Sequence, residues 1–300
     1  MTQLGLGSAP LGGLFEAVSD DEAHRVVEAA WKAGIRFFDT APLYGHGLAE
    51  QRFGAVLRTK PRDEFVIATK VGRLLRKDAP PEPGQAYKGA PPVNPVFDFS
   101  YDGVMRSAEE SLVRLGLDRI DVLHIHDPDD HYEEALSGAY RALDRMRSEG
   151  TIKAVGAGMN QAEMLARFAR EADFDCFLLA GRYTLLDTIG LKELLPLCVE
   201  KGIAIIAGGV FNSGILADPR PGATYNYQAA PPALVERALE LEAVCNRRGV
   251  DLKAAAIQFP LRHPAVASVL TGCRSVAEVE ENVRMFETPI PDTLWDELDA

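Results

Sequence analysis

Eight short, β-rich apolar segments recur along this chain, and stretches with the pattern of amphipathic helices separate them. Short apolar runs between turn signals are typical of buried strands. The expected strands cover residues 4–8, 36–40, 65–70, 121–126, 153–158, 176–181, 203–208 and 267–272. Because strands that alternate with helices form parallel sheets, eight such units predict a closed (β/α)8 TIM barrel with the helices outside.

The segments between the strands carry apolar residues at helical spacing. The first one has Ser19 in the N-cap position, acidic residues in its first turn and Gly34 at its end, all of which are helix signals. The expected helices cover residues 19–34, 101–116, 133–150, 162–172, 191–202, 232–249 and 275–286.

Two connections are much longer than the others. They follow the third and seventh strands and read "RLLRKDAPPEPGQAYKGAPPVNPVFDF" and "GVFNSGILADPRPGATYNYQAAPP". Both leave the C-terminal end of a strand, which is the active-site face of this architecture, so we expect substrate and cofactor loops. Surface insertions without a function are the alternative. Since no interdomain linker or repeat interrupts the pattern, residues 1–300 are expected to form a single domain.

The composition excludes several classes of partner. The net charge of −12 opposes binding to nucleic acid, and no run of eighteen apolar residues predicts a membrane span. The N-terminal residues lack the pattern of a secretory signal, and the four cysteines (Cys176, Cys198, Cys245 and Cys273) form no CxxC motif. We therefore expect a cytoplasmic protein with reduced thiols that acts on a small molecule, as a monomer or small homo-oligomer.

Ionisable residues stand at the ends of three consecutive strands. Lys70 ends the third strand and His126 the fourth, Asp39 is the last residue but one of the second, and Tyr44 follows five residues after Asp39. Neighbouring strands lie about 5 Å apart, so these side chains are expected to meet at one rim of the barrel. Singly, each has an alternative role as a buried hydrogen-bonding group or a rim salt bridge.

Together, these four groups suit proton transfer at oxygen. A free tyrosine has a pKa of about 10, and a nearby lysine cation favours the phenolate, so Lys70 is expected to lower the pKa of Tyr44. Asp39 would hold Lys70, and His126 would share a proton with the phenol or orient the substrate oxygen. The predicted site exchanges a proton with a carbonyl or hydroxyl oxygen, and a nicotinamide hydride is the natural partner at carbon.

The stretch "DVLHIHDPDDH" raises a different possibility. His124 and His126 lie on one face of the fourth strand, a spacing that also suits a metal-dependent barrel hydrolase. Such enzymes need further ligands, and the last four strands end without His or Asp. We therefore expect no metal, and we expect His124 to be a hydrogen-bonded core residue.

Six motifs, in order, cover nearly the whole chain: "FFDTAPLYGHG", "VIATKVG", "DVLHIHDP", "VGAGMN", "FNSGIL" and "TGCRSVAEVEENV". In this order they resemble the aldo-keto reductase superfamily, whose (β/α)8 barrel binds NAD(P) without a Rossmann domain. The resemblance implies that Tyr44 is the general acid/base, assisted by Lys70, Asp39 and His126.

The resemblance also assigns cofactor contacts. Asn160 matches the residue that holds the nicotinamide carboxamide, and Met159 stands before it where Ser is usual. The usual carboxamide-binding glutamine is replaced by Ala180, and the usual stacking tyrosine falls at Gly208, so Phe211 is the expected stacking ring. On the pyrophosphate and adenine sides the matching residues are Ser213, Gly214, Glu281 and Asn282.

One departure concerns the choice of cofactor. Members that prefer NADP place Lys and Arg around the adenosine 2′-phosphate, and these positions read Gly272 and Glu278 here. An acidic residue repels that phosphate, so NAD is favoured over NADP. Arg274 is the exception, because it could still reach a 2′-phosphate.

Within the superfamily, "GLGSAPLGGLF", "DTAPLYGHGLAEQRFG" and "LLAGRYTLLD" resemble a branch of L-fucose, L-galactose and D-threo-aldose 1-dehydrogenases. That branch also resembles pyridoxal 4-dehydrogenase, and a general aldehyde or ketone reductase is a further alternative. The resemblance implies oxidation of an anomeric carbon to a lactone. His46, Asp127 and Arg182 are the expected substrate-pocket residues, and Asp127 replaces an aromatic residue common in the family.

Overall fold

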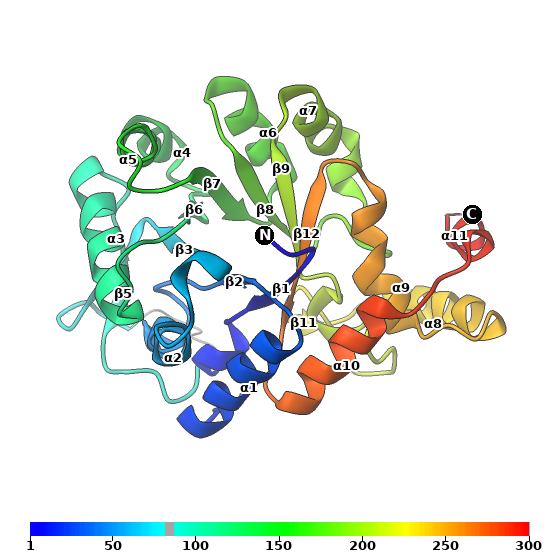
Figure 1. Cartoon of the computed structure of the whole chain (residues 1–300). Helices are drawn as coiled ribbons and strands as arrows, with labels where there is room; N and C mark the ends of the chain where they lie inside the picture. Colours follow the sequence, from blue (N-terminus) through cyan, green and yellow to red (C-terminus); the bar gives the residue numbers. More distant parts are fainter. Residues whose placement is uncertain (82–86, 300) are drawn as a thin grey trace.

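The computed structural model describes residues 1–81 and 87–299, and eight parallel strands close into a barrel inside a ring of helices (Figure 1). Each end of every expected strand falls within one residue of the observed end, so the barrel prediction is confirmed. Around the barrel the strands are β1 (Leu4–Gly7), β12 (Val266–Gly272), β9 (Ala204–Gly208), β8 (Cys176–Ala180), β7 (Ala154–Met159), β6 (Val122–His126), β3 (Val66–Val71) and β2 (Phe37–Asp39).

The helices are α1 (Asp20–Lys32), α2 (Leu48–Leu57), α3 (Tyr101–Leu115), α4 (Tyr132–Glu134), α5 (Arg141–Ser148), α6 (Ala162–Glu171), α7 (Leu194–Lys201), α8 (Pro232–Arg247), α9 (Leu252–Gln258), α10 (Val276–Glu287) and α11 (Asp292–Leu298). Five 3-10 turns cover Pro10–Gly12, Arg62–Glu64, Ile189–Lys192, Asn212–Gly214 and Phe259–Arg262. The expected N-cap is present, since Ser19 Oγ accepts a hydrogen bond from the backbone N–H of Glu22 at 3.2 Å. Among the described residues, no helix is long and apolar enough to span a membrane.

One expected helix is interrupted. Residues 133–150 carry the pattern of one continuous helix, but a π-helical turn at Ala135–Tyr140 separates α4 from α5. Gly138 lies in this turn, where a side chain would collide with the backbone oxygen of Phe99. The irregular turn therefore lies where the backbone at Gly138 packs closely against the loop before α3.

The alternation of side chains along the strands divides the core into two parts. One face of each strand packs outward against the helices, as Leu6, Phe38 and Leu123 do. The opposite face fills the barrel interior with a small cluster: Phe37, Ala68, Val122, Cys176, Leu178 and Ile206. Asp39 and Lys70 stand two residues beyond Phe37 and Ala68, so they point to the same inner side, one layer nearer the C-terminal rim.

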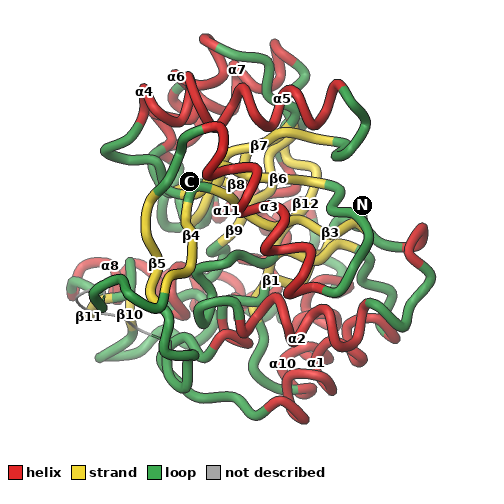
Figure 2. The backbone as a smooth tube through the Cα atoms, turned by 90° about the vertical axis from the view of Figure 1, so that its left-hand side faces the viewer, coloured by secondary structure: helices red, strands yellow, loops and turns green. Residues whose placement is uncertain are grey.

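Two hairpins extend the C-terminal face. The first pairs β4 (Arg73–Arg76) with β5 (Asn94–Phe97), and the second pairs β10 (Thr224–Tyr225) with β11 (Gln228–Ala229). In the side view both hairpins lie on the same side of the molecule, away from the N-terminus (Figure 2). The two long connections therefore rise from the C-terminal ends of the strands, where catalytic loops are found in such barrels.

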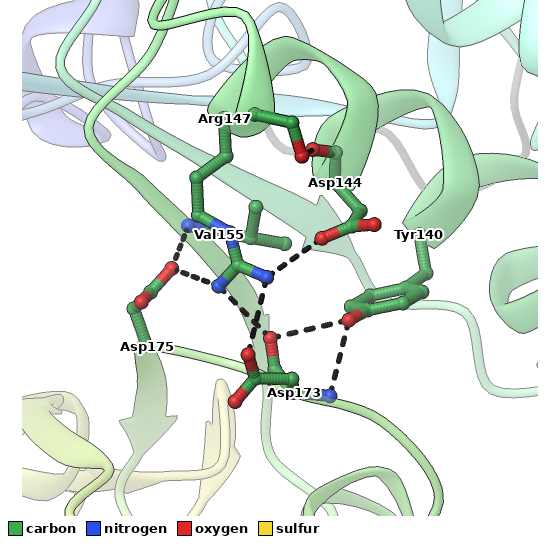
Figure 3. Close-up of polar contacts among 7 residues, drawn as sticks. Tyr140, Asp144, Arg147, Val155, Asp173 and Asp175 are labelled. Carbon is green, nitrogen blue, oxygen red and sulfur yellow. Dashed lines mark hydrogen bonds and ion pairs between the residues drawn. The ribbon is translucent and has the colours of Figure 1, made fainter.

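The opposite, N-terminal face carries a network of charged groups around Arg147 (Figure 3). The guanidinium contacts Asp144 and Asp175 at 2.7 Å each and Asp173 at 3.4 Å. Asp175 also accepts a hydrogen bond from the backbone N–H of Val155 at 2.7 Å. This network joins α5 to the strands β7 and β8, and its position on the face away from the loops suits a stabilising role.

Candidate active site

A buried ion pair forms the centre of the rim constellation. Lys70 Nζ lies 2.6 Å from Asp39 Oδ1 and donates a second hydrogen bond to the carbonyl of Thr40 at 2.8 Å. Both side chains are only 1% exposed. Burial raises the pKa of Asp39, and the neighbouring Lys70 cation opposes that rise. Burial makes each charge costly without its partner, so the hydrogen bonds from Lys70 to Asp39 and Thr40 hold the pair in position.

The loop after β2 brings Tyr44 over this pair. Gly45 has a φ of 60° and packs against the backbone of Gly12, where a side chain on either residue would collide. Lys70 Nζ lies 4.7 Å from the centroid of the Tyr44 ring. The His126 ring stands edge-on to the same phenol, with centroids 5.8 Å apart. The structure thus brings together the four residues of the expected acid/base group.

The protonation of Tyr44 differs from the expectation. Burial raises the pKa of Tyr44 well above its usual value, Asp39 and Asp127 raise it further, and Arg73 opposes them. The prediction of a lowered pKa is therefore wrong for this site, because the loss of solvent around the phenolate and the nearby carboxylates dominate. Tyr44 is held as a neutral phenol, which is the form that donates a proton.

His126 is held in its neutral form. Burial lowers its pKa well below the usual value, and Arg73 and Lys70 lower it further. Its Nε2 lies 3.4 Å from Asp127 Oδ2, and its Nδ1 is buried without a hydrogen-bond partner among the described residues. A neutral imidazole beside the phenol can accept or pass on a proton.

His124 lies one layer deeper than His126. It is fully buried, and burial with Lys70 lowers its pKa to about 3. The expectation of a core residue holds, but neither ring nitrogen has a hydrogen-bond partner within residues 1–81 and 87–299, so the expected hydrogen bonding is wrong. The same described residues contain no group of three or more His, Cys, Asp or Glu side chains placed to hold a metal ion.

A cavity of about 450 Å³ begins at Tyr44 and Asp39 and continues along the rim to α10. Its walls contain most of the expected cofactor residues: Asn160, Phe211, Ser213, Gly214, Gly272, Arg274, Glu278, Glu281 and Asn282. The shape and the glycine-rich wall suit an elongated ligand that reaches the phenol at one end. Asn282 Oδ1 is buried there without a hydrogen-bond partner in the described part of the chain, so an acceptor is available for such a ligand.

The charged side chains at the α10 end are paired. Arg274 Nη2 contacts Glu278 Oε1 at 2.9 Å, and Nη1 contacts Glu16 at 3.3 Å. Lys253 Nζ forms an ion pair with Glu281, and it also lies 5.5 Å from the centroid of the Phe211 ring. Each cation is thus matched by at least one carboxylate, which leaves no net positive charge for an additional phosphate.

Other expected cofactor residues occupy distinct positions. Ser213 lies in a left-handed conformation with a φ of 60°, and its Oγ accepts a hydrogen bond from the backbone N–H of Tyr227 at 3.1 Å. Phe211 lies beside Lys253, on the Glu281 side, and its stacking on a nicotinamide stays a prediction. Met159 is 1% exposed in the outer core and does not line the cavity.

The three expected substrate-pocket residues lie around the rim but outside the walls of the cavity. His46 is buried, and its Nδ1 contacts the carbonyl of Val93, so it holds the loop after β3. Arg182 donates a hydrogen bond to Asn226 Oδ1 at 3.0 Å and so holds the hairpin β10–β11. Asp127 contacts His126 directly and is the one nearest the chemistry.

Sequence reasoning missed four residues at the site. Tyr227 and Lys253 line the cavity, Tyr87 lies 6.3 Å from Tyr44 between ring centroids, and Arg73 pairs with Asp127 at 3.2 Å. Three of them are on the long loops or at their start, and no spacing rule fixes where such side chains point. The sole available signal was that both loops leave the catalytic face.

Comparison with known proteins identifies what the chain resembles. The profile of the aldo/keto reductase family matches residues 3–300. The chain is 46% identical to pyridoxal 4-dehydrogenase of Microbacterium luteolum, with 99% of the chain and 93% of the relative aligned. It is 47% identical to D-threo-aldose 1-dehydrogenase of a Pseudomonas species, over 98% and 92%. The glycerol dehydrogenase structure from Gluconobacter oxydans superposes with a TM-score of 0.77 at 24% identity, over 100% and 90%, which supports the fold.

Proposed function

Since this chain belongs to the aldo/keto reductase family, we propose that it oxidises the anomeric carbon of an aldose to a lactone with NAD, using Tyr44 as its acid/base. The observation that carries the proposal is the meeting of Tyr44 with the Asp39–Lys70 pair and His126 at one end of the elongated cavity. Proton transfer and hydride transfer must occur at adjacent atoms, and this end of the cavity offers the proton-transfer group.

The residues of the cavity fit a nicotinamide dinucleotide. Asn160 at the Tyr44 end would hold the carboxamide, and the turn at Ser213 and Gly214 would lie along the pyrophosphate. Asn282, with its buried unpartnered oxygen, would accept a hydrogen bond at the adenine end. When bound, the nicotinamide accepts the hydride that leaves the substrate carbon.

The chain's own residues manage the proton. In oxidation the phenolate of Tyr44 accepts the proton of the anomeric hydroxyl and becomes a phenol, and neutral His126 orients that hydroxyl from the side of the ring. Lys70 stabilises the phenolate that must form before this step, and Asp39 holds Lys70 in place. In reduction the same phenol donates its proton, and its raised pKa keeps it protonated before this step.

The paired charges support NAD as the cofactor. Glu278 and Glu16 form ion pairs with the guanidinium of Arg274. Arg274 was the one residue expected to be able to bind a 2′-phosphate. A 2′-phosphate would have to displace these carboxylates or lie beside them, which costs free energy through repulsion of like charges.

The names of the relatives support two substrate classes. One relative is a D-threo-aldose 1-dehydrogenase and another is a pyridoxal 4-dehydrogenase, at nearly equal identity. We favour the aldose because Asp127 and Arg73 make the rim beside Tyr44 polar, which suits a ring that carries hydroxyl groups. Pyridoxal is the second candidate because its relative aligns over the same length.

The test is NADH formation, followed by absorbance, with purified protein and a panel of L-fucose, L-galactose, D-arabinose and pyridoxal. Each is assayed with NAD and with NADP, with and without EDTA. The proposal predicts that an aldose reduces NAD rapidly and that EDTA does not change the rate. Turnover of pyridoxal alone would select the second candidate. Oxidation of NADPH by simple aldehydes, without reaction of any panel member, would overturn both.

A further inference from the structure

Arg73 is a buried cation beside the acid/base group that the mechanism above does not use. It follows β3 directly, after Gly72, whose φ of 100° and contact with the Phe99 ring leave no room for a side chain. Its side chain is 10% exposed, and its guanidinium lies 4.6 Å from the centroid of the Phe97 ring. The tight turn at Gly72 and the aromatic ring together hold Arg73 in one place.

The partners of Arg73 are few for a buried arginine. Its Nη2 contacts Asp127 Oδ2 at 3.2 Å, while its Nε is buried without a hydrogen-bond partner in the described residues. A buried guanidinium with an unmet donor lowers the stability of the fold. Arg76, three residues further along β4, is 29% exposed and paired with Glu110, so the strand has a better solvated arginine for comparison.

The partner of Arg73 also contacts the site of chemistry. The same oxygen of Asp127 lies 3.4 Å from His126 Nε2, and Asp127 has a φ of 42°, an uncommon conformation for a residue other than glycine. Asp127 and Arg73 both act on the proton affinity of Tyr44, with opposite signs. The carboxylate of Asp127 thus contacts both the imidazole of His126 and the guanidinium of Arg73.

We propose that Arg73 determines substrate specificity by donating a hydrogen bond to the hydroxyl group next to the reacting carbon, while Asp127 accepts one from the same hydroxyl. A hydroxyl both donates and accepts, and this neighbouring pair supplies one partner of each kind. Because the pair has no net charge, it suits a neutral polyhydroxylated substrate. The inference rests on the proposed function and names the feature of the aldose that is recognised.

This recognition has a measurable consequence. A site that holds a hydroxyl by buried polar groups discriminates against the analogue that lacks it. A hydrogen bond to a charged group contributes about 1.5–3 kcal/mol, so its loss lowers kcat/KM by about 10- to 150-fold. D-Arabinose and 2-deoxy-D-ribose form a matched pair, since they differ in the hydroxyl beside the anomeric carbon and in nothing else.

The experiment compares kcat/KM for these two sugars with NAD in the wild type, Arg73→Leu and Arg76→Leu. The second variant is the matched control, because it removes the same charge from the same strand at a more exposed position. The wild type and Arg76→Leu should prefer D-arabinose by about 10- to 150-fold, and Arg73→Leu should lose most of this preference. Asp127→Asn, which keeps the shape and tolerates a positive φ, should lower the ratio in the same direction if Arg73→Leu does not fold.

The outcomes separate this inference from the function beneath it. Oxidation of D-arabinose by the wild type, with an unchanged preference in both Arg73→Leu and Asp127→Asn, would overturn the role of Arg73 and leave the dehydrogenase intact. An equal loss of preference in Arg76→Leu would also overturn it. A wild type that oxidises no sugar of the panel in the preceding test would overturn the proposed function, and this inference with it.

Discussion

A buried phenol determines what this site does at neutral pH. Tyr44 meets a lysine at 4.7 Å from its ring, yet its pKa is raised, because desolvation of the phenolate and the carboxylates of Asp39 and Asp127 dominate. The protonated form is the general acid of carbonyl reduction, and the deprotonated form is the general base of oxidation. The two directions of the reaction therefore need opposite forms of one residue.

The raised pKa of Tyr44 predicts different pH profiles for the two directions. Below this pKa the phenolate fraction increases about tenfold per pH unit, so kcat/KM for aldose oxidation should rise steadily from pH 7 to pH 10. Reduction uses the phenol, which stays fully populated, so its rate should be nearly flat. Initial rates in both directions across this range check the prediction, and an oxidation profile that is flat from pH 7 would contradict it.

Glu278 is the residue expected to exclude NADP. Replacing it with Arg removes a carboxylate, leaves Arg274 with Glu16 as its carboxylate partner and adds a second guanidinium, so Glu278→Arg should lower the Kd for NADP by about tenfold or more. Glu280→Arg makes the same charge change at an exposed position of the same helix and should leave that Kd nearly unchanged. Titration of both variants with NADP measures the difference, and equal effects would mean that overall charge governs the choice.

The sequence identified the site residues whose positions follow from regular strands, and it missed those whose positions depend on turns and packing. Asp39, Lys70 and His126 stand at the ends of predicted strands, so period-two alternation and barrel closure were enough to place them together. Arg73 and Lys253 were missed because their positions depend on a tight turn and on helix packing. The protonation of Tyr44 was predicted in the wrong direction because burial follows from loops that the sequence pattern does not define.

At the scale of elements, the sequence predicted the helices and strands that have regular apolar patterns. It missed a helix with a polar buried face and the short strands of the loops. The helix α2 (Leu48–Leu57) was missed because its buried face includes Glu50, which accepts hydrogen bonds from Thr69 at 2.7 Å and Arg114 at 2.5 Å. Such a face has no continuous apolar stripe. The hairpins β4–β5 and β10–β11 were missed because short strands within Pro- and Gly-rich loops lack a strand-length pattern.

The contact between α2 and the end of α3 predicts the effect of one substitution. A Cβ on Gly54 would lie 2.0 Å from the backbone oxygen of Leu115. Alanine favours a helix over glycine by about 1 kcal/mol, but the helices must separate to admit the methyl group, so Gly54→Ala should destabilise the protein by about 1–3 kcal/mol.

Chemical denaturation measures this change, and Ala55→Gly is the control on the same helix. The control tests helix propensity alone, since Ala55 is the next residue of α2 and is partly exposed. It should cost about 1 kcal/mol. Stabilisation by Gly54→Ala would show that α2 is not tightly packed against α3.

At the scale of the whole molecule, strand alternation creates one inner core and one outer core, and every barrel strand except β1, which contributes only to the outer core, contributes side chains to both. Because β1 pairs with β12, the first and last thirds of the chain are joined by backbone hydrogen bonds. We therefore propose that the chain unfolds as one unit, as a single domain does.

The two tryptophans offer a test of this unity. Trp31 lies on α1, edge-on to Phe65 at 6.1 Å between centroids, and Trp295 lies on α11 beside Arg262. In Trp31→Phe the fluorescence reports α11, and in Trp295→Phe it reports α1. Within each variant, fluorescence and far-UV circular dichroism should give the same denaturation midpoint. Separate midpoints by the two probes would mean that an end of the chain unfolds independently.

The central claim is that Tyr44 exchanges the proton while the rest of the cavity binds the dinucleotide. Its most direct test is Tyr44→Phe, assayed for NADH formation with whichever panel substrate the wild type oxidises, alongside titration of the variant with NADH. Tyr101→Phe, on the exposed face of α3, is the control. The account predicts that kcat falls by about 10²–10⁴-fold in Tyr44→Phe while NADH still binds. Wild-type turnover in Tyr44→Phe would contradict the mechanism.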